Sequence, residues 1–450
     1  MSSALPAVEQ PSTQHGRLGS QSRAGGDSRL ARWAPLLAGV CTAVLLAATL
    51  EVVLDGATGH SPLIPKSPQI AGWLGALGAR LSFQVFLVAL LAFTAAYAGM
   101  LGLSRWLSAR WVLGLVAVLH LIVFVGPILF STDVFSYIAY ARMGVEHGIN
   151  PYLHGPSAII HDPVYRYVGQ SWKHVQTAYG PLYTLISYPL APLGVTGALW
   201  GMKLMGLAAS AGTLALTWRC ARIRGLSPSF AVLAVGVNPL YILYGFGGAH
   251  NDLILMLAMM AAVSLTLAGR DAPAAAAVVG GMLVKATGAV LLPFMILGRR
   301  QVGAIVGGAG AMLGAAVVAY TVFGVHGVDL IAALNRNAAF VSTDSFPTEI
   351  AHLFGKPGVF PIDHTLLKAA LVVIVLHLMW RTWRGYDWVA ASGWTLLAIS
   401  VTSTWLLAWY IVWSLPLAVV TRDRRLLAAT LAIQALFIAH QVSPLFVQVR

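Results

Sequence analysis

Asp133 is the residue whose type and position most clearly suggest chemistry. It follows an apolar segment, residues 111–130, and leads a polar, aromatic-rich stretch that ends at Pro181. Carboxylates at a membrane boundary are costly and usually functional. Partial removal from water raises the pKa of a carboxyl group toward the range that suits a general base. A helix-terminal carboxylate facing water is the alternative, but the nearby aromatic residues favour a pocket: Phe130, Phe135, Tyr137 and Tyr140.

A second group of polar side chains lies in residues 247–252, with the sequence GGAHND. The glycines permit a tight turn and a close approach of the backbone. His250, Asn251 and Asp252 would then begin a helix, whose N-terminus favours anions. Asn251 or Asp252 would equally suit a capping role without any ligand. A metal at His250 and Asp252 would need further ligands nearby, so we predict no metal site.

Two cations are candidates for binding phosphate. Lys285 lies in an otherwise apolar run, GGMLVKATGAVLLPF, and a lysine inside a membrane segment should face a cavity or a partner. Its ammonium group would suit a phosphate, whereas snorkelling to the interface is the alternative. Arg336, between two asparagines, is a second and weaker candidate.

Aromatic residues are concentrated in two further stretches. Trp405, Trp409, Tyr410 and Trp413 would form either an interfacial belt or the wall of a sugar or lipid groove. Residues 165–179, YRYVGQSWKHVQTAY, mix aromatic with hydrogen-bonding groups. That mixture suits sugar recognition, and it equally suits an amphipathic surface helix.

The composition indicates a polytopic membrane protein. Of 450 residues, 58% are hydrophobic and only 10% are charged, whereas soluble domains carry about 25% charged residues. The net charge of +13 does not indicate nucleic-acid binding, because the basic residues fall in short connectors between spans. The two cysteines, Cys41 and Cys220, lie in or at the end of apolar runs and are interpreted as small core residues.

The predicted fold is an all-α, polytopic transmembrane helical bundle of about 13 membrane segments. Residues 1–32 are predicted to be a disordered cytoplasmic tail, because they hold few bulky apolar residues and several arginines. Residues 33–54 would be a retained signal anchor, and the transmembrane domain would extend over residues 33–450. Two larger outer loops, residues 131–194 and 323–362, are expected on the extracytoplasmic face.

The basic connectors set finer expectations for topology. Residues 180–194 should form a helix along the membrane, and residues 195–218 a full span. Residues 274–296 are too short for two spans, so we expect two half-length helices that meet near Lys285. This topology brings Asp133, the His-Asn-Asp triplet, Lys285 and the Arg336 loop to one outer face.

Six short stretches of this sequence resemble integral-membrane glycosyltransferases of the GT-C superfamily. Within it, the chain is similar to actinobacterial polyprenol-phosphomannose-dependent alpha-1,6-mannosyltransferases. The similar stretches, in chain order, are DVFSY, GINPYLHGP, AYGPL, GGAHND, VKATG and WYIVWSLPL. The family favours Asp-Pro-Tyr where this chain has Asn150, and it commonly has Tyr where Phe135 stands. These departures leave the identity of the sugar and of the acceptor open.

The resemblance implies an inverting transfer on the outer face of a bacterial plasma membrane. The donor would be a polyprenyl-phosphate-linked sugar, most often mannose, and the acceptor a glycan or glycolipid, with no cofactor. Asp133 would be the catalytic base, and the donor phosphate would contact Lys285, Arg336 and His250. Our remaining predicted substrate contacts are Tyr137, Arg142, Tyr152, Tyr179, Asn251, Asp252, Trp409 and Tyr410.

Three alternatives remain open. A lipid or sugar transporter would also have many spans, an intramembrane lysine and broken helices, but the sequence shows no second copy of DVFSY or GGAHND. A non-catalytic envelope scaffold would lose no chemistry when Asp133 is changed. Transfer of another lipid-linked sugar, such as the pentose arabinofuranose, also fits, because the sugar is selected by the shape of the pocket.

Overall fold

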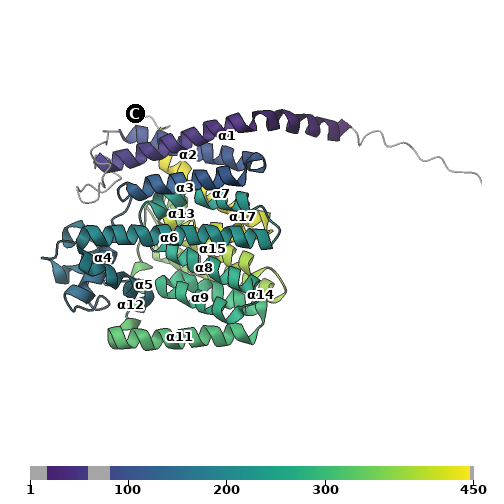
Figure 1. Cartoon of the computed structure of the whole chain (residues 1–450). Coiled ribbons are helices and arrows are strands. Elements are labelled where there is room, and N and C mark those ends of the chain that lie inside the picture. Colours follow the sequence, from purple (N-terminus) through teal and green to yellow (C-terminus); the bar gives the residue numbers. More distant parts are fainter. Residues whose placement is uncertain (1–17, 59–81, 446–450) are drawn as a thin grey trace, which may run out of the picture.

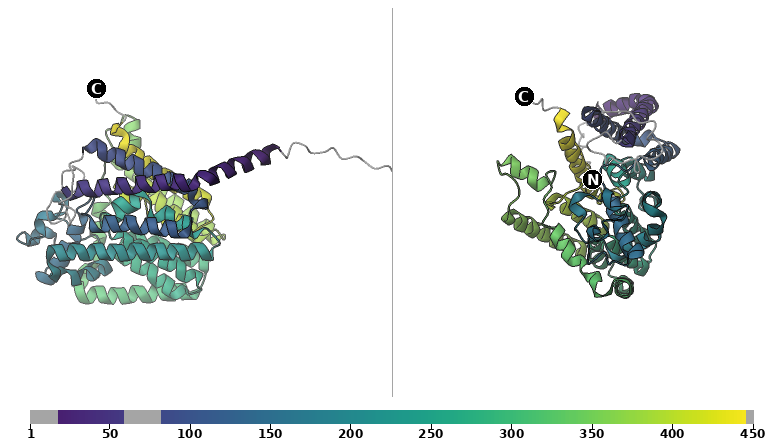
Figure 2. Two further views of the ribbon diagram at one scale, coloured as in Figure 1. Left: turned by 45° about the horizontal axis from the view of Figure 1, so that its top comes forward. Right: turned by 90° about the vertical axis from the view of Figure 1, so that its left-hand side faces the viewer.

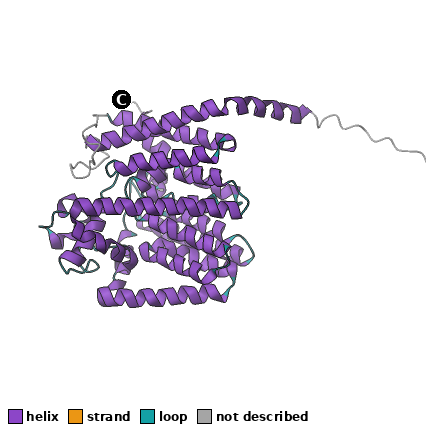
Figure 3. Cartoon of the chain, viewed as in Figure 1, coloured by secondary structure: helices purple, strands orange, loops and turns teal. Residues whose placement is uncertain are grey.

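The structure, a computed structural model, describes residues 18–58 and 82–445 of the chain. Within these residues the secondary structure is helical throughout, with no strand (Figure 3). This result confirms the predicted all-α fold. Both predicted outer loops contain short helices of their own.

The first half of the chain forms six α-helices before the first bent segment. Their bounds are α1 (Leu18–Thr58), α2 (Phe83–Leu103), α3 (Ala109–Val125), α4 (Asp133–Glu146), α5 (Pro181–Ser187) and α6 (Gly194–Ile223). A bent pair follows, consisting of α7 (Pro228–Gly236) and the π-helix η8 (Leu240–Phe246). The two members of this pair meet at an angle of 50°.

The second half alternates long helices with short ones. Their bounds are α8 (Asp252–Leu267), α9 (Asp271–Val284), α10 (Leu291–Arg299), α11 (Val302–Phe323), α12 (Leu330–Asn337), α13 (Phe346–Leu353), α14 (Pro361–Trp383), α15 (Trp388–Thr402), α16 (Leu415–Ala418) and α17 (Arg424–Val442).

Six helices of the described part are long and apolar enough to cross a membrane, and the bent pair adds a seventh candidate. The other apolar helices are each 10–17 residues long, which is shorter than the ~20 residues of a full crossing. The chain is therefore a helical membrane protein. The count of about 13 segments and the sidedness of the loops stay predictions.

The beginning of the chain differs from expectation. Helix α1 starts at Leu18, so residues 18–32 continue the apolar helix instead of forming a tail without structure. Helix propagation is favourable once a long helix exists, and arginine and alanine are good helix formers. Residues 1–17 of the predicted tail lie outside the described residues.

The helices are arranged so that α8 lies inside the bundle. Helix α8 packs against α6 and α9, and α11 packs on the outer side of α9. Helices α1 and α11 lie at opposite edges of the bundle (Figures 1 and 2). Helices α4, α5 and α12, which come from the two predicted outer loops, gather at one end. That end of the bundle carries the candidate site.

The predicted interruption near Lys285 is confirmed. Helix α9 ends at Val284, Lys285 has an extended backbone, and a short 3-10 helix, Ala286–Val290, leads into α10. The segment before α6 consists of α5 and a 3-10 helix, Tyr188–Leu193. Helix α6 begins at Gly194, whose φ of 69° suits glycine. The predicted course of residues 180–194 along the membrane stays a prediction, because residues 181–223 together form one of the candidate spans.

Gly180 allows the first outer loop to touch the break in α9. Its backbone N–H donates to the carbonyl oxygen of Val284 at 3.1 Å. A β-carbon at this position would overlap the carbonyl oxygen of Leu283. Because this contact is so close, the neighbouring Tyr179 is placed beside Lys285.

Gly180→Ala should therefore destabilise the protein. Forcing a methyl group into a filled position typically costs about 1–3 kcal/mol. We expect a lower melting temperature for the purified protein in detergent. Gly114→Ala in α3 is the matched control, because a β-carbon there meets nothing within 4 Å and alanine favours helices. Equal melting temperatures for the two variants would contradict the assigned contact.

Candidate active site

The segment between α3 and α4 places Asp133 at the first turn of α4. The N–H of Leu129 donates to the carbonyl oxygen of Gly247 at 2.9 Å, which ties this segment to the GGAHND turn. The N–H of Asp133 itself donates to Ser131 Oγ at 3.1 Å. The two polar segments singled out in the sequence are therefore held side by side by backbone hydrogen bonding.

Both segments contain a non-glycine residue in the left-handed region. Phe130 has φ 61° and Ala249 has φ 50°. Such conformations cost about 1–3 kcal/mol and persist only when the surroundings enforce them. For Phe130 the enforcing contact is a stack on Tyr244, with ring centroids 4.2 Å apart. The left-handed conformation of Phe130 changes the direction of the backbone three residues before α4 begins at Asp133.

Lys203 also positions the Asp133 segment, and sequence reasoning did not single it out. Its ammonium group, buried within α6, donates to the carbonyl oxygen of Gly126, the residue that ends α3. It also lies 4.6 Å from the ring centroid of Trp200. The available signal was a lysine within an apolar span, where a cation needs a partner.

The environment of Asp133 suits a base. Its side chain is 15% exposed. Burial raises the pKa of this carboxyl group to about 6, and the charge of Asp252 adds to the effect, whereas Lys285 and the hydrogen bond with Ser131 oppose it. Asp133 is therefore ionised at neutral pH, yet it is far more basic than an ordinary aspartate.

His250 lies behind Asp133. Its Nδ1 is 3.8 Å from Asp133 Oδ2 and 3.3 Å from the hydroxyl oxygen of Tyr137. Its ring stacks on Trp409 with centroids 3.6 Å apart. Burial, together with the charge of Lys285, holds the pKa of His250 well below its usual value, so the ring is neutral. A neutral ring packs beside Asp133 without contributing positive charge.

Asp252 and Lys285 form a buried ion pair. Asp252 Oδ1 accepts from Lys285 Nζ at 2.8 Å and from Trp413 Nε1 at 2.6 Å. The Asp252 side chain is fully buried, and Lys285 also lies over the ring of Tyr410. Lys285 therefore does not snorkel. Asn251 precedes the helix but makes no side-chain capping hydrogen bond, so the capping interpretation is not observed for it.

One cavity collects the polar and aromatic groups at this end of the bundle. Four predicted site residues line it: Asp133, Tyr179, Lys285 and Tyr410. Further lining residues were not among the predicted contacts: Ser136, Tyr140, Trp172, Gln176, Thr287, Asn337, Trp405 and Trp413. Trp172 and Trp405 lie in the two aromatic stretches noted above, so aromatic content was the available signal. Tyr137, His250, Asn251, Asp252 and Trp409 are buried behind the wall.

The aromatic segment after α15 forms the wall of this cavity. Tyr410 and Trp413 stack on each other at 4.5 Å, and both line the cavity with Trp405. Trp409 is buried against His250. Of the two interpretations of these aromatic residues, the groove is the one that the structure supports.

Three other predicted residues lie beside the cavity or away from it. Arg336 donates to Gln176 Oε1 at 2.8 Å, which places it at the rim. The Tyr152 hydroxyl donates to the carbonyl oxygen of Tyr179 at 2.9 Å and so supports a residue of the wall. Arg142 does not line the cavity. Direct substrate contacts for Arg142 and Tyr152 stay predictions.

Arg142 is instead part of a buried network within the first outer loop. Its Nε donates to both oxygens of Asp162 at 3.0 Å, and its Nη1 donates to the carbonyl oxygen of Ala191. His147 Nε2 lies 2.8 Å from Asp162. Burial opposes ionisation of Asp162, but the hydrogen bonds with Arg142 and His147 outweigh it and hold the pKa of this carboxyl below its usual value. The network fixes the shape of the loop that carries Tyr179.

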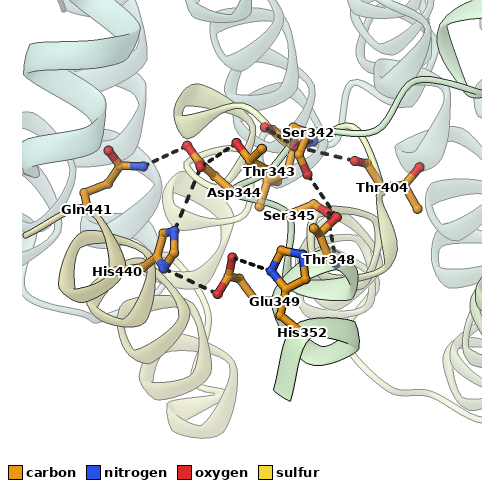
Figure 4. A network of polar contacts seen from close by, with 11 residues as sticks. Ser342, Thr343, Asp344, Ser345, Thr348, Glu349, His352, Thr404, His440 and Gln441 are labelled. Atoms are coloured by element: carbon orange, nitrogen blue, oxygen red, sulfur yellow. Dashed lines mark hydrogen bonds and ion pairs between the residues drawn. The ribbon is translucent and has the colours of Figure 1, made fainter. Parts of the chain in front are cut away.

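The second outer loop is anchored by a network of polar contacts (Figure 4). The N–H of Ser342 donates to the carbonyl oxygen of Thr404 at 2.8 Å, beside Trp405 of the cavity. At the other end of the network, His440 of α17 lies 3.5 Å from Glu349 and 3.9 Å from Asp344. These contacts join α17, the second outer loop and the aromatic wall.

The described residues contain no group of three His, Cys, Asp or Glu side chains that would hold a metal ion. The groups at the site that can do chemistry are the Asp133 carboxylate, the ion pair of Lys285 with Asp252, and the aromatic wall.

A helical membrane protein with one polar, aromatic-walled cavity at the end of its bundle is the class that these observations define. Within that class the chain belongs to the alpha-(1->6)-mannopyranosyltransferase family, because the family's N-terminal domain matches residues 36–299. The predicted relationship to these membrane mannosyltransferases is confirmed. The match ends before α11, so the part of the wall formed by Trp405, Tyr410 and Trp413 lies outside it.

Individual relatives agree with this assignment. The chain is 27% identical over 333 residues to alpha-(1->6)-mannopyranosyltransferase A of Mycobacterium tuberculosis, covering 67% of this chain and 63% of the relative. It is 25% identical over 366 residues to a probable alpha-(1->6)-mannopyranosyltransferase of Mycolicibacterium smegmatis, covering 69% of this chain and 65% of the relative. The chain thus spans less than two thirds of the length of these curated relatives. No solved structure matches it.

Asp133→Asn should stabilise the folded protein at neutral pH. The pKa of Asp133 is raised on folding from 3.8 to about 6, so the ionised form costs stability. Stability from this group is present below pH 4 and is lost as the pH rises through 6. At about 1.4 kcal/mol per pKa unit, the amide should recover up to about 3 kcal/mol at pH 7.5.

Thermal unfolding in detergent at pH 7.5 and pH 4 measures this effect. The gain in melting temperature should be present at pH 7.5 and nearly absent at pH 4. Glu146→Gln, an exposed carboxylate on the same helix, is the matched control and should show no gain. A lower melting temperature for Asp133→Asn at pH 7.5 would mean that the carboxylate is stabilised by its surroundings.

Asp252→Asn should strongly destabilise the protein. The substitution keeps the shape and an acceptor for Trp413, but it leaves Lys285 without its counter-charge. Breaking a buried ion pair from one side costs about 3–5 kcal/mol. Trp413→Phe removes one hydrogen bond to the same carboxylate and part of a buried ring, but it leaves the ion pair in place and should cost less, about 1–3 kcal/mol. Thermal unfolding compares the two, and a milder effect for Asp252→Asn would contradict the assigned pairing.

Proposed function

We propose that this protein is an inverting glycosyltransferase. It would transfer a sugar, most often mannose, from a polyprenyl-phosphate donor to a glycan or glycolipid acceptor. The supporting observation is that the Asp133 carboxylate, with its raised pKa, and the Lys285 ammonium line the same cavity. A base and a cation at one cavity are what a displacement at a sugar phosphate requires.

In the proposed reaction, Asp133 accepts the proton of an acceptor hydroxyl. The oxygen of that hydroxyl attacks the anomeric carbon of the donor sugar as the bond to the phosphate oxygen breaks. Asp133 is the only carboxylate among the described residues that line the cavity. A single displacement needs one base and inverts the anomeric carbon, whereas a double displacement would need a second nucleophilic group.

The departing phosphate gains negative charge, and Lys285 is the cation placed to stabilise it. Its ion pair with Asp252 holds the ammonium group at the cavity wall, so little reorganisation is needed during the reaction. Arg336, at the rim beside Gln176, would supply a second positive charge. His250 would keep Asp133 oriented instead of binding phosphate, because its ring is neutral.

The wall of the cavity suits sugars. Trp172, Trp405 and Tyr410 offer flat apolar faces on which a sugar ring can pack. Ser136 and Gln176 offer groups for hydroxyls at the same cavity, and the hydroxyl of Ser136 is buried without a partner among the described residues. A donor already attached to lipid would remain in the membrane while its sugar enters this end of the bundle.

We further propose that this end faces outward from a bacterial plasma membrane. Positively charged connectors favour the cytoplasmic side, and the outer loops of the predicted topology contain the cavity. Membrane sidedness of this kind is consistent with an acceptor in the cell envelope. The relatives are named for alpha-(1->6)-mannopyranosyl transfer, which supports mannose as the sugar and a 1,6 linkage.

A transfer assay with the purified protein in nanodiscs tests the proposal. Radiolabelled polyprenyl-phosphomannose and a short alpha-mannoside are supplied to wild type and to Asp133→Asn. Loss of a general base should reduce the turnover number by about 10²–10⁴-fold. Wild-type turnover should also fall below pH 6, where Asp133 becomes protonated, whereas the residual activity of Asp133→Asn should lack this dependence.

Controls distinguish loss of chemistry from loss of structure. Glu146→Gln should transfer at the wild-type rate. Asp133→Asn should retain donor binding. Lys285→Met should lower the turnover number, because it removes the cation beside the departing phosphate, and should also lower the melting temperature, because it leaves the buried Asp252 unpaired. Transfer from a lipid-linked pentose instead of mannose would change the sugar but keep the reaction. Normal turnover by Asp133→Asn would remove its catalytic role, and no transfer from any lipid-linked sugar would overturn the proposal.

A further inference from the structure

A second cavity adjoins the candidate active site on the side of α14. Four residues line both cavities: Leu334, Asn337, Trp405 and Tyr410. The remaining lining of the second cavity comes mainly from α14 and from α15 and the residues after it. We name this second cavity the lateral groove. The four shared residues show that the two cavities are adjacent.

The lateral groove has a polar end and an apolar end. His364 and Lys368 lie one turn apart on α14 and line the groove. Leu371, one further turn along α14, and Ile399 of α15 line it as well. Along α14, the basic residues of the lining are thus followed by apolar ones. That sequence of groups matches an anionic amphiphile with its head toward the start of α14.

Helix α14 is the outer wall of this groove and faces away from the protein core. Only 6% of its apolar window is buried inside the protein. Its outward side chains include Leu366, Val372 and Leu376, each more than half exposed. A helix with such a surface is suited to contact lipid, so the lateral groove lies directly behind a lipid-facing helix.

Lys368 has no counter-ion in the part of the chain that the structure describes. No ion pair there joins it to a carboxylate, whereas Lys285 is paired with Asp252 at 2.8 Å and Lys356 lies 3.5 Å from Asp363. A lysine on a membrane helix needs an anionic partner or access to water. Lys368 lines a groove that adjoins the candidate active site.

We infer that the lateral groove binds the lipid donor, with Lys368 and His364 at the donor phosphate and the prenyl chain along Leu371 and Ile399. The inference rests on the proposed function. It assigns both cations to the single phosphate of the donor: Lys368 would contact it from the lateral groove, and Lys285 from the side of the reacting anomeric carbon. The sugar then lies in the first cavity, between Asp133 and Tyr410.

Kinetics in nanodiscs of zwitterionic lipid test this inference. Lys368→Ala should raise the KM for polyprenyl-phosphomannose about tenfold or more, because a charged partner of the phosphate is lost. The KM for the alpha-mannoside acceptor should not change. Lys368→Arg should restore most of the donor affinity. Lys356→Ala, an exposed lysine just before α14, is the matched control and should behave as wild type.

Leu371→Trp tests the apolar part of the groove independently of charge. The indole should obstruct the path of a long prenyl chain, so the KM for the long-chain donor should rise. A short, water-soluble prenyl-phosphomannose should be used as well by this variant as by wild type. Leu366→Trp, on the lipid-facing side of α14, is its control and should leave both donors unaffected.

The outcomes separate this inference from the proposed function. If wild type transfers no lipid-linked sugar, the proposed function fails and the inference fails with it. If wild type transfers and Lys368→Ala keeps a donor KM within twofold of wild type, the groove assignment alone is overturned. The assignment is also overturned if added anionic phospholipid inhibits wild type but not Lys368→Ala while the two proteins have the same donor KM. In that case the groove holds a structural lipid.

Discussion

The buried ion pair between Asp252 and Lys285 is the interaction on which the candidate site depends. It joins the first turn of α8 to the break in α9, and the Trp413 indole attaches the aromatic segment to the same carboxylate oxygen. Neither charge is tolerable alone in such an environment. The pair therefore specifies one arrangement of three segments, and the cavity is the space that this arrangement leaves between them.

The same charges set the chemistry of Asp133. Burial makes its carboxylate basic, the nearby Asp252 adds to the effect, and Lys285 limits it. The resulting pKa of about 6 keeps the group ionised and still able to take a proton. His250, neutral and stacked on Trp409, lies 3.8 Å from the Asp133 carboxylate. Burying the ionised Asp133 carboxylate costs folding stability, and the left-handed backbone conformations of Phe130 and Ala249 cost stability as well. These costs accompany the fixed geometry of the site.

Local sequence signals predicted the features that depend on local physics. An apolar run too short for two spans predicted the break at Lys285, and clustered polar residues predicted the segments around Asp133 and His250. Pairings between distant residues were not accessible. The contacts of Arg142 with Asp162 and of Lys285 with Asp252 join residues 20 and 33 positions apart, respectively, and no local pattern in the sequence reveals them. The start of α1 was missed because helix propagation from an apolar span overrode a polar composition.

The ion pair also has a consequence for the synthesis of this protein. Asp252 leaves the ribosome 33 residues before Lys285 and 161 residues before Trp413. A growing chain therefore carries an uncompensated carboxylate at the start of α8 until the α9 segment has entered the membrane. The wall formed by Trp405, Tyr410 and Trp413 arrives later still. A truncated product would contain Asp133 and His250 but no closed cavity. The site is therefore complete only after the whole chain has been inserted into the membrane.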